Sequence, residues 1–274
     1  MTDIQQKQGS LVCVGTGITL GAHITPIAKS HIEQADIVFI TGNTGFMQMW
    51  LTELNPNVHD LQQYYQEGKP RSRTYQQMMD EMLNAMRQGK KVVGAFYGHP
   101  GMFVTPTHKA IKQAQAEGYF AKMEAGISAE DCLISDCGID PGRVGCANFE
   151  ASQFINFQRQ IDNSAHLILW QVGFVGDTTL TQFSTGEQYR AILVEVLNQH
   201  YPVDHEIILY EAASTALEQP RIDKMPLQDF IDAEVKQITT MIIPPSAKLK
   251  VNKRIQAKLA ELEKQRNAPA LSSV

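Results

Sequence analysis

The chain has 274 residues, 43% of them hydrophobic and 19% charged, which suffices for one large domain or two small ones. Its formal net charge of −5 argues against a nucleic-acid partner, and no segment approaches the length of a membrane span, so we expect neither a nucleic acid nor a membrane as partner. The four cysteines form no CxxC pair and no disulfide-scaffold pattern, which indicates reduced thiols, a cytoplasmic protein and no structural metal.

The first predicted unit is a strand, a glycine-rich loop, a helix and a second strand. Residues 10–14 are apolar, the Gly15-Thr16-Gly17 loop follows, residues 24–32 have helical spacing, and residues 36–40 are again largely apolar. This order of elements implies a parallel sheet.

The same loop resembles a dinucleotide-binding fingerprint. The third glycine, Gly21, comes one position late, and Thr41 and Gly42 stand where an acidic residue would follow the second strand. A nicotinamide or flavin site is therefore the weaker interpretation of this loop.

Residues 46–89 have a helical pattern, and the part from Thr74 onward carries one apolar face. Its members recur at steps of three and four residues, which is the spacing of a helix stripe. We predict that this stripe is a core face and not a binding surface: Tyr75, Met78, Met79, Met82, Leu83 and Met86.

A dense set of phenols and guanidiniums precedes this stripe, from Tyr64 to Tyr75, around one glycine and one proline. If a helix begins at Arg71, the side chains of Arg71 and Tyr75 are about one turn apart and point the same way. The alternative is a solvated surface turn whose aromatic side chains are partly packed.

The central loop of the chain follows a predicted buried strand at residues 91–96. The Gly98-His99-Pro100-Gly101 turn prevents the strand or a helix from continuing, so a ligand can lie against bare main chain here. Tyr97 and His99 are then at the carboxyl end of the strand, where open α/β sheets place their ligands. The alternative is an ordinary strand-to-helix turn with an exposed histidine.

The second half begins after a predicted helix at residues 108–117 and a small-residue turn at residues 126–131 with an acidic helix start. We divide the chain into an N-terminal domain with a catalytic helical arm, a C-terminal domain and a tail, at residues 1–125, 126–246 and 247–274. In the second domain, the pattern predicts strands at residues 165–172, 205–210 and 239–243 and helices at residues 186–199 and 227–237.

The tail predicts a basic amphipathic helix. Between Ala247 and Arg266 it carries seven Lys or Arg and two Glu, with an apolar stripe formed by Val251, Ile255, Leu259 and Leu262. Two interpretations are open: a solvated helix packed on its own domain, or a dimer brace or docking surface for an acidic partner.

Four motifs follow one another along the chain: Val14-Gly15-Thr16-Gly17, Gly98-His99-Pro100-Gly101, Gly126-Ile127-Ser128-Ala129 and Leu169-Trp170-Gln171. This order resembles the tetrapyrrole methylase superfamily, over residues 10–245. The resemblance implies two α/β domains of the class III S-adenosylmethionine methyltransferase type, with the cofactor in the cleft between them. The sequence departs from the common Gly-Asp-Pro pattern at His99, and its first loop lacks the usual following proline.

These departures point to one branch of the superfamily. The run Tyr65, Arg71, Ser72, Thr74 and Tyr75, followed by Phe96-Tyr97-Gly98-His99-Pro100-Gly101 and Phe103-Val104, is similar to the borosin α-N-methyltransferases. Those enzymes methylate backbone amides of a ribosomal peptide. In fused borosins the methylase continues into a clasp, a leader and a core peptide, whereas this chain stops at Val274 and resembles the split form.

The borosin resemblance implies iterative methylation, in trans, of a separate precursor peptide. It also implies a homodimer, or a heterotetramer with two precursors. A backbone amide nitrogen is a poor nucleophile, so the reaction needs a base and a donor for the developing oxyanion. An adjacent arginine favours a tyrosine phenolate, which fits Arg71 beside Tyr75, and Tyr65 can complete a hydrogen-bond chain. By resemblance the catalytic residues are Tyr65, Arg71, Tyr75 and Tyr97, with Tyr97 bridging substrate and methyl donor.

The same resemblance implies S-adenosylmethionine as cofactor, with S-adenosylhomocysteine as product. It implies that eleven residues bind this cofactor: Tyr97, His99, Met102, Phe103, Ser128, Ala129, Gln171, Glu211, Ala212, Ile242 and Ile243. Two other functions remain open. A tetrapyrrole methyltransferase shares the fold and cofactor but needs a wide, flat cleft. A non-catalytic module that only chaperones a peptide need not bind the cofactor.

Overall fold

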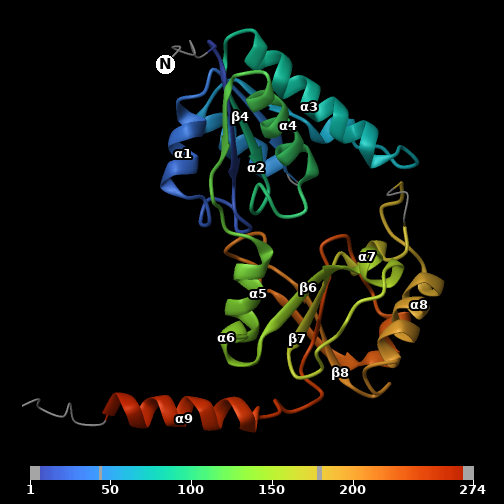
Figure 1. The fold of residues 1–274 in the computed structure, drawn as a ribbon. Helices are drawn as coiled ribbons and strands as arrows, with labels where there is room; N and C mark the ends of the chain where they lie inside the picture. Colours follow the sequence, from blue (N-terminus) through green and yellow to red (C-terminus); the bar gives the residue numbers. More distant parts are fainter. Residues whose placement is uncertain (1–6, 43–44, 178–180, 268–274) are drawn as a thin grey trace, which may run out of the picture.

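The computed structural model describes residues 7–42, 45–177 and 181–267. Each of two stacked α/β halves is built on a five-stranded sheet, and a C-terminal helix lies apart from both (Figure 1). The connection between the halves runs from the last strand of the first sheet to the helix that begins at Ala129. The domain boundary that we predict near residue 125 falls in this connection.

The first sheet is entirely parallel. Its strands are β1 (Ser10–Gly15), β2 (Ile37–Thr41), β3 (Val58–Asp60), β4 (Lys91–Phe96) and β5 (Phe120–Met123), in the order β3-β2-β4-β1-β5. Helices cover both faces, so β1, β2 and β4 are nearly continuous apolar runs. The predicted strands at residues 10–14, 36–40 and 91–96 are confirmed within one residue.

Two pairs of helices cover the first sheet. α1 (Pro26–Glu33) and α2 (Gly45–Leu54) pack on one face, and α3 (Arg71–Arg87) and α4 (Thr105–Ala116) pack on the other. A 3₁₀ turn, η1 (Gln62–Tyr64), leads toward α3. The predicted apolar stripe of α3 is core, because every member except the half-buried Tyr75 is buried.

The second sheet is mixed. Its strands are β6 (Cys146–Glu150), β7 (His166–Trp170), β8 (Glu206–Glu211), β9 (Arg221–Pro226) and β10 (Thr240–Ile243), in the order β6-β7-β10-β8-β9. Only β6 and β7 are parallel to each other. α7 (Ala151–Asn156) and α8 (Glu187–Asn198) pack on one face and α5 (Ala129–Cys137) on the other, with α6 (Pro141–Val144) leading into β6.

The predicted helix at residues 227–237 is wrong. Residues Leu227–Asp232 form a 3₁₀ turn, η3, and residues 233–239 have no regular structure. The main-chain carbonyls that a helix would use are bound by arginines instead: Arg190 Nε donates to Ile231 O at 2.7 Å and Arg221 Nη1 to Glu234 O at 2.9 Å. Side-chain donors therefore replace the helix ladder here.

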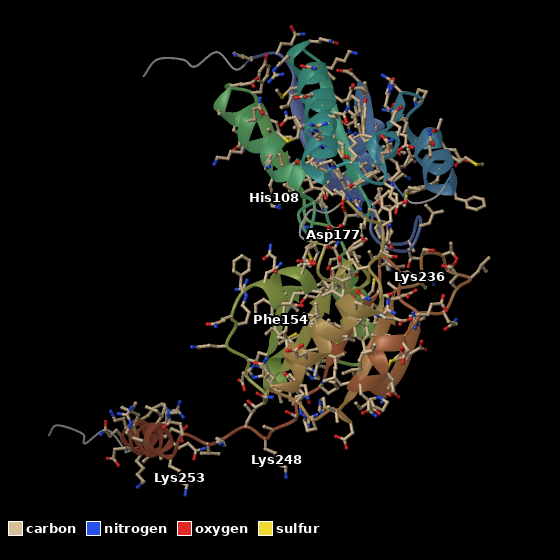
Figure 2. The ribbon with its side chains drawn as sticks, turned by 90° about the vertical axis from the view of Figure 1, so that its right-hand side faces the viewer. His108, Phe154, Asp177, Lys236, Lys248 and Lys253 are labelled. Carbon is tan, nitrogen blue, oxygen red and sulfur yellow. The ribbon has the colours of Figure 1, made fainter. Side chains whose placement is uncertain are left out.

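The tail forms a helix, α9 (Lys253–Asn267), as predicted. It does not pack on its own domain: the helix lies beyond the second half (Figure 1), and Figure 2 shows Lys253 at the same distant position. The apolar stripe is open to solvent, with exposed fractions of 38% at Ile255 and 61% at Val251. No helix in the part of the chain that the structure describes is long and apolar enough to cross a membrane.

Candidate active site

The ends of β1 and β4 meet in a crossing of two glycine loops. Gly98 N donates to Gly17 O at 3.0 Å, and Gly17 N donates to Gly98 O at 3.3 Å. A Cβ atom on Gly15 would stand 2.2 Å from the Gly98 carbonyl oxygen, so only glycine permits this approach. The crossing fixes the central loop at the carboxyl edge of the parallel sheet, as the sequence predicts.

The central loop continues with two features that orient its side chains. His99 Nδ1 accepts a hydrogen bond from Gly101 N at 3.0 Å, so this half-buried histidine is held by its own turn. Phe103 has φ 57°, in the left-handed region that a bulky side chain rarely adopts, and its ring lies 5.9 Å from that of Trp170. Backbone strain of this kind is typical of ligand-binding loops.

A small cavity of about 190 Å³ lies between the halves beside this loop. Eight of the eleven predicted cofactor residues line it: Tyr97, His99, Met102, Phe103, Ser128, Ala129, Gln171 and Ala212. Six further residues, which the sequence analysis does not assign to the cofactor, also line this cavity: Ile18, Gly98, Trp170, Tyr210, Gln237 and Ile238. Trp170 had a signal, because it precedes Gln171 in one of the four motifs.

The other three predicted cofactor residues do not line this cavity. The side chains of Ile242 and Ile243 are fully buried in the two cores of the second half. The Glu211 carboxylate is buried in an ion-pair cluster with Arg221 and Lys236. Glu211 precedes Ala212, which lines the cavity, but its carboxylate points toward the ion-pair cluster. The side chains of Ile242 and Ile243 point into the cores.

A large cleft of about 740 Å³ adjoins the small cavity. It is lined by all four predicted catalytic residues, Tyr65, Arg71, Tyr75 and Tyr97. Five residues line both the cleft and the cavity, so the two spaces meet at a common point, which we call the junction: Tyr97, Phe103, Gln171, Gln237 and Ile238.

Arg71 begins α3, as the arm prediction requires, and its guanidinium is surrounded by aromatic rings. It lies 4.7 Å from the ring centre of Tyr65, 5.3 Å from that of Phe183 and 5.9 Å from that of Phe174. The rings of Tyr65 and Tyr75 are nearly perpendicular, with centres 6.5 Å apart. The alternative of a surface turn with partly packed aromatic side chains holds for residues 66–68, which are exposed, and for the half-buried Tyr65 and Tyr75, but the Arg71 guanidinium lies among aromatic rings.

The arm also reaches across the cleft to the second half. Phe174 and Phe183 belong to the second half, and Gly68 N donates to Thr181 O at 2.9 Å. These contacts close one side of the large cleft. In Figure 2 the labelled Asp177, which also lines the cleft, lies at the level where the halves meet.

Two phenols in the cleft, those of Tyr65 and Tyr97, hold their protons strongly. Burial and the neighbouring Tyr75 raise the pKa of Tyr65 to about 12, although Arg71 acts in the opposite direction. Burial, with smaller contributions from Cys132 and Glu218, raises the pKa of Tyr97 to about 12. At Tyr65 desolvation outweighs the attraction of the adjacent Arg71 guanidinium, so the pKa rises in spite of this neighbour.

The large cleft is rich in side-chain amides and poor in positive charge. Its charged residues are Arg71, Glu150 and Asp177. Glu150 accepts hydrogen bonds from the main chain of α7, and Asp177 accepts from the main chain of Thr181 and Gln182. Of its seven side-chain amides, six make no hydrogen bond to another described residue: Gln62, Gln153, Asn156, Gln171, Gln182 and Gln237.

Comparison with known proteins identifies the family to which the chain belongs. Residues 10–229 match the family model described as Tetrapyrrole (Corrin/Porphyrin) Methylases. The chain belongs to this family. A solved structure of uroporphyrin-III-C-methyltransferase from Thermus thermophilus shares the fold, with a TM-score of 0.62 at 14% identity over 87% of this chain and 93% of that chain.

Within the tetrapyrrole methylase family, this chain is more similar to a set of fungal proteins. It is 44% identical over 245 residues to the methyltransferase/ribosomally synthesized cyclic peptide gymnopeptides precursor gymMA1 of Gymnopus fusipes, covering 88% of this chain and 58% of that protein. It is 40% identical over 257 residues to the methyltransferase/ribosomally synthesized type I borosin cyclic peptide precursor cmaMA of Coprinopsis marcescibilis, covering 90% and 66%. The predicted resemblance to borosin methyltransferases is confirmed, and the chain spans about three fifths of these relatives.

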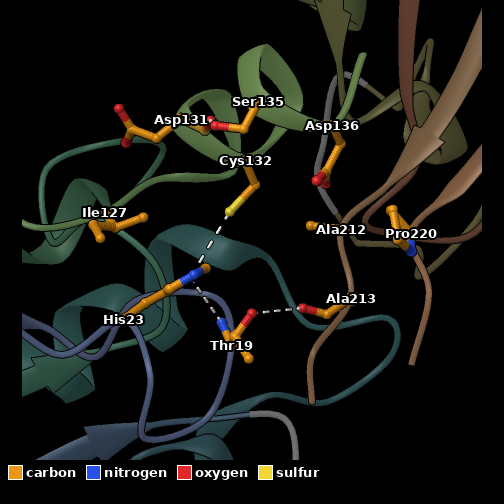
Figure 3. A pocket seen from close by; sticks show the side chains of 10 residues that line it. All are labelled: Thr19, His23, Ile127, Asp131, Cys132, Ser135, Asp136, Ala212, Ala213 and Pro220. Atoms are coloured by element: carbon orange, nitrogen blue, oxygen red, sulfur yellow. Dashed lines mark hydrogen bonds between the residues drawn. The ribbon is translucent and has the colours of Figure 1, made fainter. Parts of the chain in front are cut away.

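Figure 3 shows the residues that line a further cavity, of about 290 Å³; one of them, Ala212, also lines the small cavity. His23 Nδ1 accepts from Thr19 N at 3.1 Å and lies 3.8 Å from Cys132 Sγ. Burial, Asp136 and Asp131 raise the pKa of the Cys132 thiol to about 11. The thiol is therefore protonated at neutral pH and is a poor nucleophile.

Proposed function

We propose that this chain is an S-adenosylmethionine-dependent methyltransferase of the borosin type. It N-methylates backbone amides of a separate ribosomally made precursor peptide, in trans and more than once. The observation that carries the proposal is the junction, where the cleft that holds Tyr65, Arg71 and Tyr75 meets the small cavity. A methyl donor in the cavity and an amide in the cleft would then face each other.

The small cavity suits the cofactor in its chemistry. Apolar and aromatic side chains such as Ile18, Trp170 and Ile238 provide walls for a flat base, and the bare main chain at Gly98 permits close approach. Ser128 caps α5 in a reciprocal capping box with Asp131, so the start of a helix also borders the cavity. Bound S-adenosylmethionine would supply an electrophilic methyl group at this place.

The residues of the cleft divide the work on the substrate amide. Tyr65 and Tyr97 keep their protons at neutral pH, so they act as hydrogen-bond donors to the amide oxygen as negative charge develops there. Tyr75 is the residue that we assign as the base: in its phenolate form, after its own proton has passed to solvent, its oxygen takes the amide N–H proton, which leaves a neutral phenol and an imidate ready for methylation. Arg71, as a permanent cation, stabilises the negative charge of the phenolate before this transfer and of the imidate after it.

The charge of the cleft favours a peptide over a tetrapyrrole. A uroporphyrinoid carries several carboxylates and would require several basic partners, but Arg71 is the one basic residue among those that line the described cleft. Side-chain amides, in contrast, offer the same donor and acceptor pair as a peptide unit. The cleft is thus suited to neutral main-chain groups.

Tandem mass spectrometry tests this proposal. The chain would be co-expressed with a candidate precursor peptide, sought among the products of neighbouring reading frames, with the Tyr75→Phe variant as the inactive control. We expect added methyl groups on several main-chain amides and none with the variant. Methyl groups found only on side chains, or transfer to a uroporphyrinoid instead, would contradict the proposal. Titration with S-adenosylhomocysteine separates it from a non-catalytic module.

We also propose a homodimer, which with two precursors becomes a heterotetramer. The exposed apolar stripe of α9 supports this, because such a stripe gains stability when a second chain covers it. Sedimentation should show a dimer at micromolar concentration, and a stable monomer would contradict it. Truncation after Pro245 tests whether the tail contributes.

A further inference from the structure

The irregular segment at residues 233–239 provides two of the five junction residues, Gln237 and Ile238. It has no helix or strand hydrogen bonds of its own, so other groups must hold its position. Ile238 is 42% exposed and contributes little burial that would hold it. Contacts from other parts of the chain must therefore hold Gln237 and Ile238 at the junction.

One buried carboxylate binds the residues on both sides of Gln237 and Ile238. Glu211 Oε1 accepts from Thr239 Oγ1 at 2.7 Å, and Glu211 Oε2 accepts from Lys236 Nζ at 3.0 Å. Thr239 Oγ1 in turn accepts from Lys236 N at 2.7 Å. The two residues that flank Gln237 and Ile238 are therefore held by the same side chain.

Arg221 extends this cluster to the beginning of the segment. Its Nη1 donates to Glu211 Oε1 at 2.7 Å and to Glu234 O at 2.9 Å. The Glu211 side chain is only 7% exposed. Burial alone would raise its pKa, but hydrogen bonds from its three partners lower it below the ordinary value. The charged form is thus the one that the cluster stabilises.

The segment also packs closely against the main chain at Val172 and Gly173. A Cβ atom on Gly173 would stand 2.3 Å from the Lys236 carbonyl oxygen, and Val172 N donates to Thr239 O at 3.3 Å. Gly173 follows closely after Gln171, a junction residue with φ 60°. A shift of residues 236–239 would therefore displace the junction residues Gln237 and Ile238, and through Gly173 it would also displace Gln171. Figure 2 shows Lys236 on the second half near the boundary between the halves.

We propose that Glu211 is a positioning residue for methyl transfer, which acts through Thr239 and Lys236 to hold Gln237 and Ile238 across the junction. Gln237 is then the side-chain amide that orients the reacting peptide unit beside the methyl donor. This inference rests on the proposed function for its chemistry. The mechanical part, that the cluster fixes the turn, stands on the contacts alone.

Amide hydrogen exchange of the full-length protein without ligand tests the mechanical part. Thr239→Val keeps the shape of the side chain but removes the hydroxyl that joins Glu211 to Lys236 N. We expect faster exchange in residues 233–239 of this variant and of Glu211→Gln, and wild-type exchange in Thr239→Ser. Asp223→Asn is the matched control, because Asp223 binds Arg221 but does not contact the segment. Unchanged exchange in Thr239→Val would overturn the proposal.

Calorimetric titration with S-adenosylhomocysteine, together with methylation rates, tests the functional part. We expect Thr239→Val to bind this probe about tenfold more weakly and to lose roughly 10- to 100-fold in kcat/KM, since small misplacements in an active site have effects of this size. Thr239→Ser should restore both. If the segment loosens while affinity and rate stay at wild-type values, the proposal is wrong. If the wild-type protein itself does not bind the probe, the proposed function fails while the exchange result still decides the role of the cluster.

Discussion

The large cleft and the small cavity share five lining residues but differ in chemistry. The cleft is lined with side-chain amides, phenols and one guanidinium, whereas the cavity is lined mainly by apolar and aromatic side chains. An apolar pocket with few polar groups suits one ligand held in one pose. Hydrogen-bonding groups spread over a larger space suit a chain that binds in several registers. Under the proposed function, the cavity is for the cofactor and the cleft for a peptide that moves between methylations.

The difference predicts that changes in the arm separate catalysis from cofactor binding. Arg71→Ala and Tyr75→Phe should each lower the methylation rate by roughly 10²–10⁴-fold, because each removes a contact to the group that changes charge in the reaction. Affinity for S-adenosylhomocysteine should stay near the wild-type value, since neither residue lines the small cavity. Rates from mass spectrometry and affinity from calorimetry measure the two effects.

Gln76→Ala is the control for these arm variants, because Gln76 lies on the same helix with its side chain exposed and lines neither space. It should keep both the rate and the affinity. Near-wild-type turnover in either arm variant would show that the residue is not catalytic. A parallel loss of cofactor affinity would show that the two spaces are not separable in the way that their linings indicate.

The glycine crossing should be the point at which both spaces fail together. In Gly15→Ala the new Cβ meets the Gly98 carbonyl oxygen at 2.2 Å, which forces the central loop to shift. We expect the free energy of unfolding to fall by about 1–3 kcal/mol and affinity for S-adenosylhomocysteine to drop, since main-chain clashes cannot be relieved by rotamer changes. Denaturant unfolding and calorimetry measure these two quantities.

Gly118→Ala is the matched control for this prediction. Gly118 has φ 84°, so the substitution introduces backbone strain, but no atom lies within 4 Å of the added Cβ and the position is remote from the junction. It should cost about 1 kcal/mol of stability and leave the affinity unchanged. Equal losses of affinity in the two variants would contradict the special role of the crossing.

The elements that border the site differ in how well the sequence predicts them. The strands β1, β2 and β4 are buried on both faces, so their apolar runs and the glycines after them give both the fold and the central loop. The capping box at Ser128 and Asp131 likewise marks the start of α5. These are local signals, and the residues that the sequence assigns to the cofactor next to them line the small cavity.

The second half contains the parts that no local pattern reveals. The edge strand β9 is largely exposed and polar, and the segment with Gln237 and Ile238 has no regular structure. Their positions follow from strand pairing and from the buried Glu211 cluster, which joins residues far apart in the sequence. The sequence therefore assigns Ile242 and Ile243, on a strand, to the cofactor, whereas the residues that line the small cavity are Gln237 and Ile238 just before that strand.

A smaller effect is expected from single amides in the large cleft. Gln153→Leu keeps a similar volume but removes the donor and acceptor groups of a side-chain amide that lines the cleft and makes no hydrogen bond to another residue that the structure describes. We expect KM for the precursor to rise by about fivefold to tenfold with kcat nearly unchanged, because one hydrogen bond to the main chain of the substrate contributes about 1 kcal/mol. Steady-state kinetics with the precursor would detect this, and a lower kcat with unchanged KM would place Gln153 in catalysis instead.

The mildest test concerns the protons on the two buried phenols, Tyr65 and Tyr97. Both pKa values are raised to about 12 from an ordinary 10, so the folded protein keeps these protons after the unfolded chain has lost them. Their contribution to stability is complete below pH 10 and is lost as the pH rises from 10 through 12, by about 3 kcal/mol for each phenol. Tyr97→Phe should remove the part of this loss of stability that comes from Tyr97. Tyr189→Phe is the control, because it removes a phenol that lines neither space.

Phenolate absorbance, measured along the same titration, tests the protonation state of Tyr65 directly. A phenolate signal at neutral pH that disappears in Tyr65→Phe would show that the attraction of Arg71 outweighs burial. Tyr65 would then be a base and not a hydrogen-bond donor.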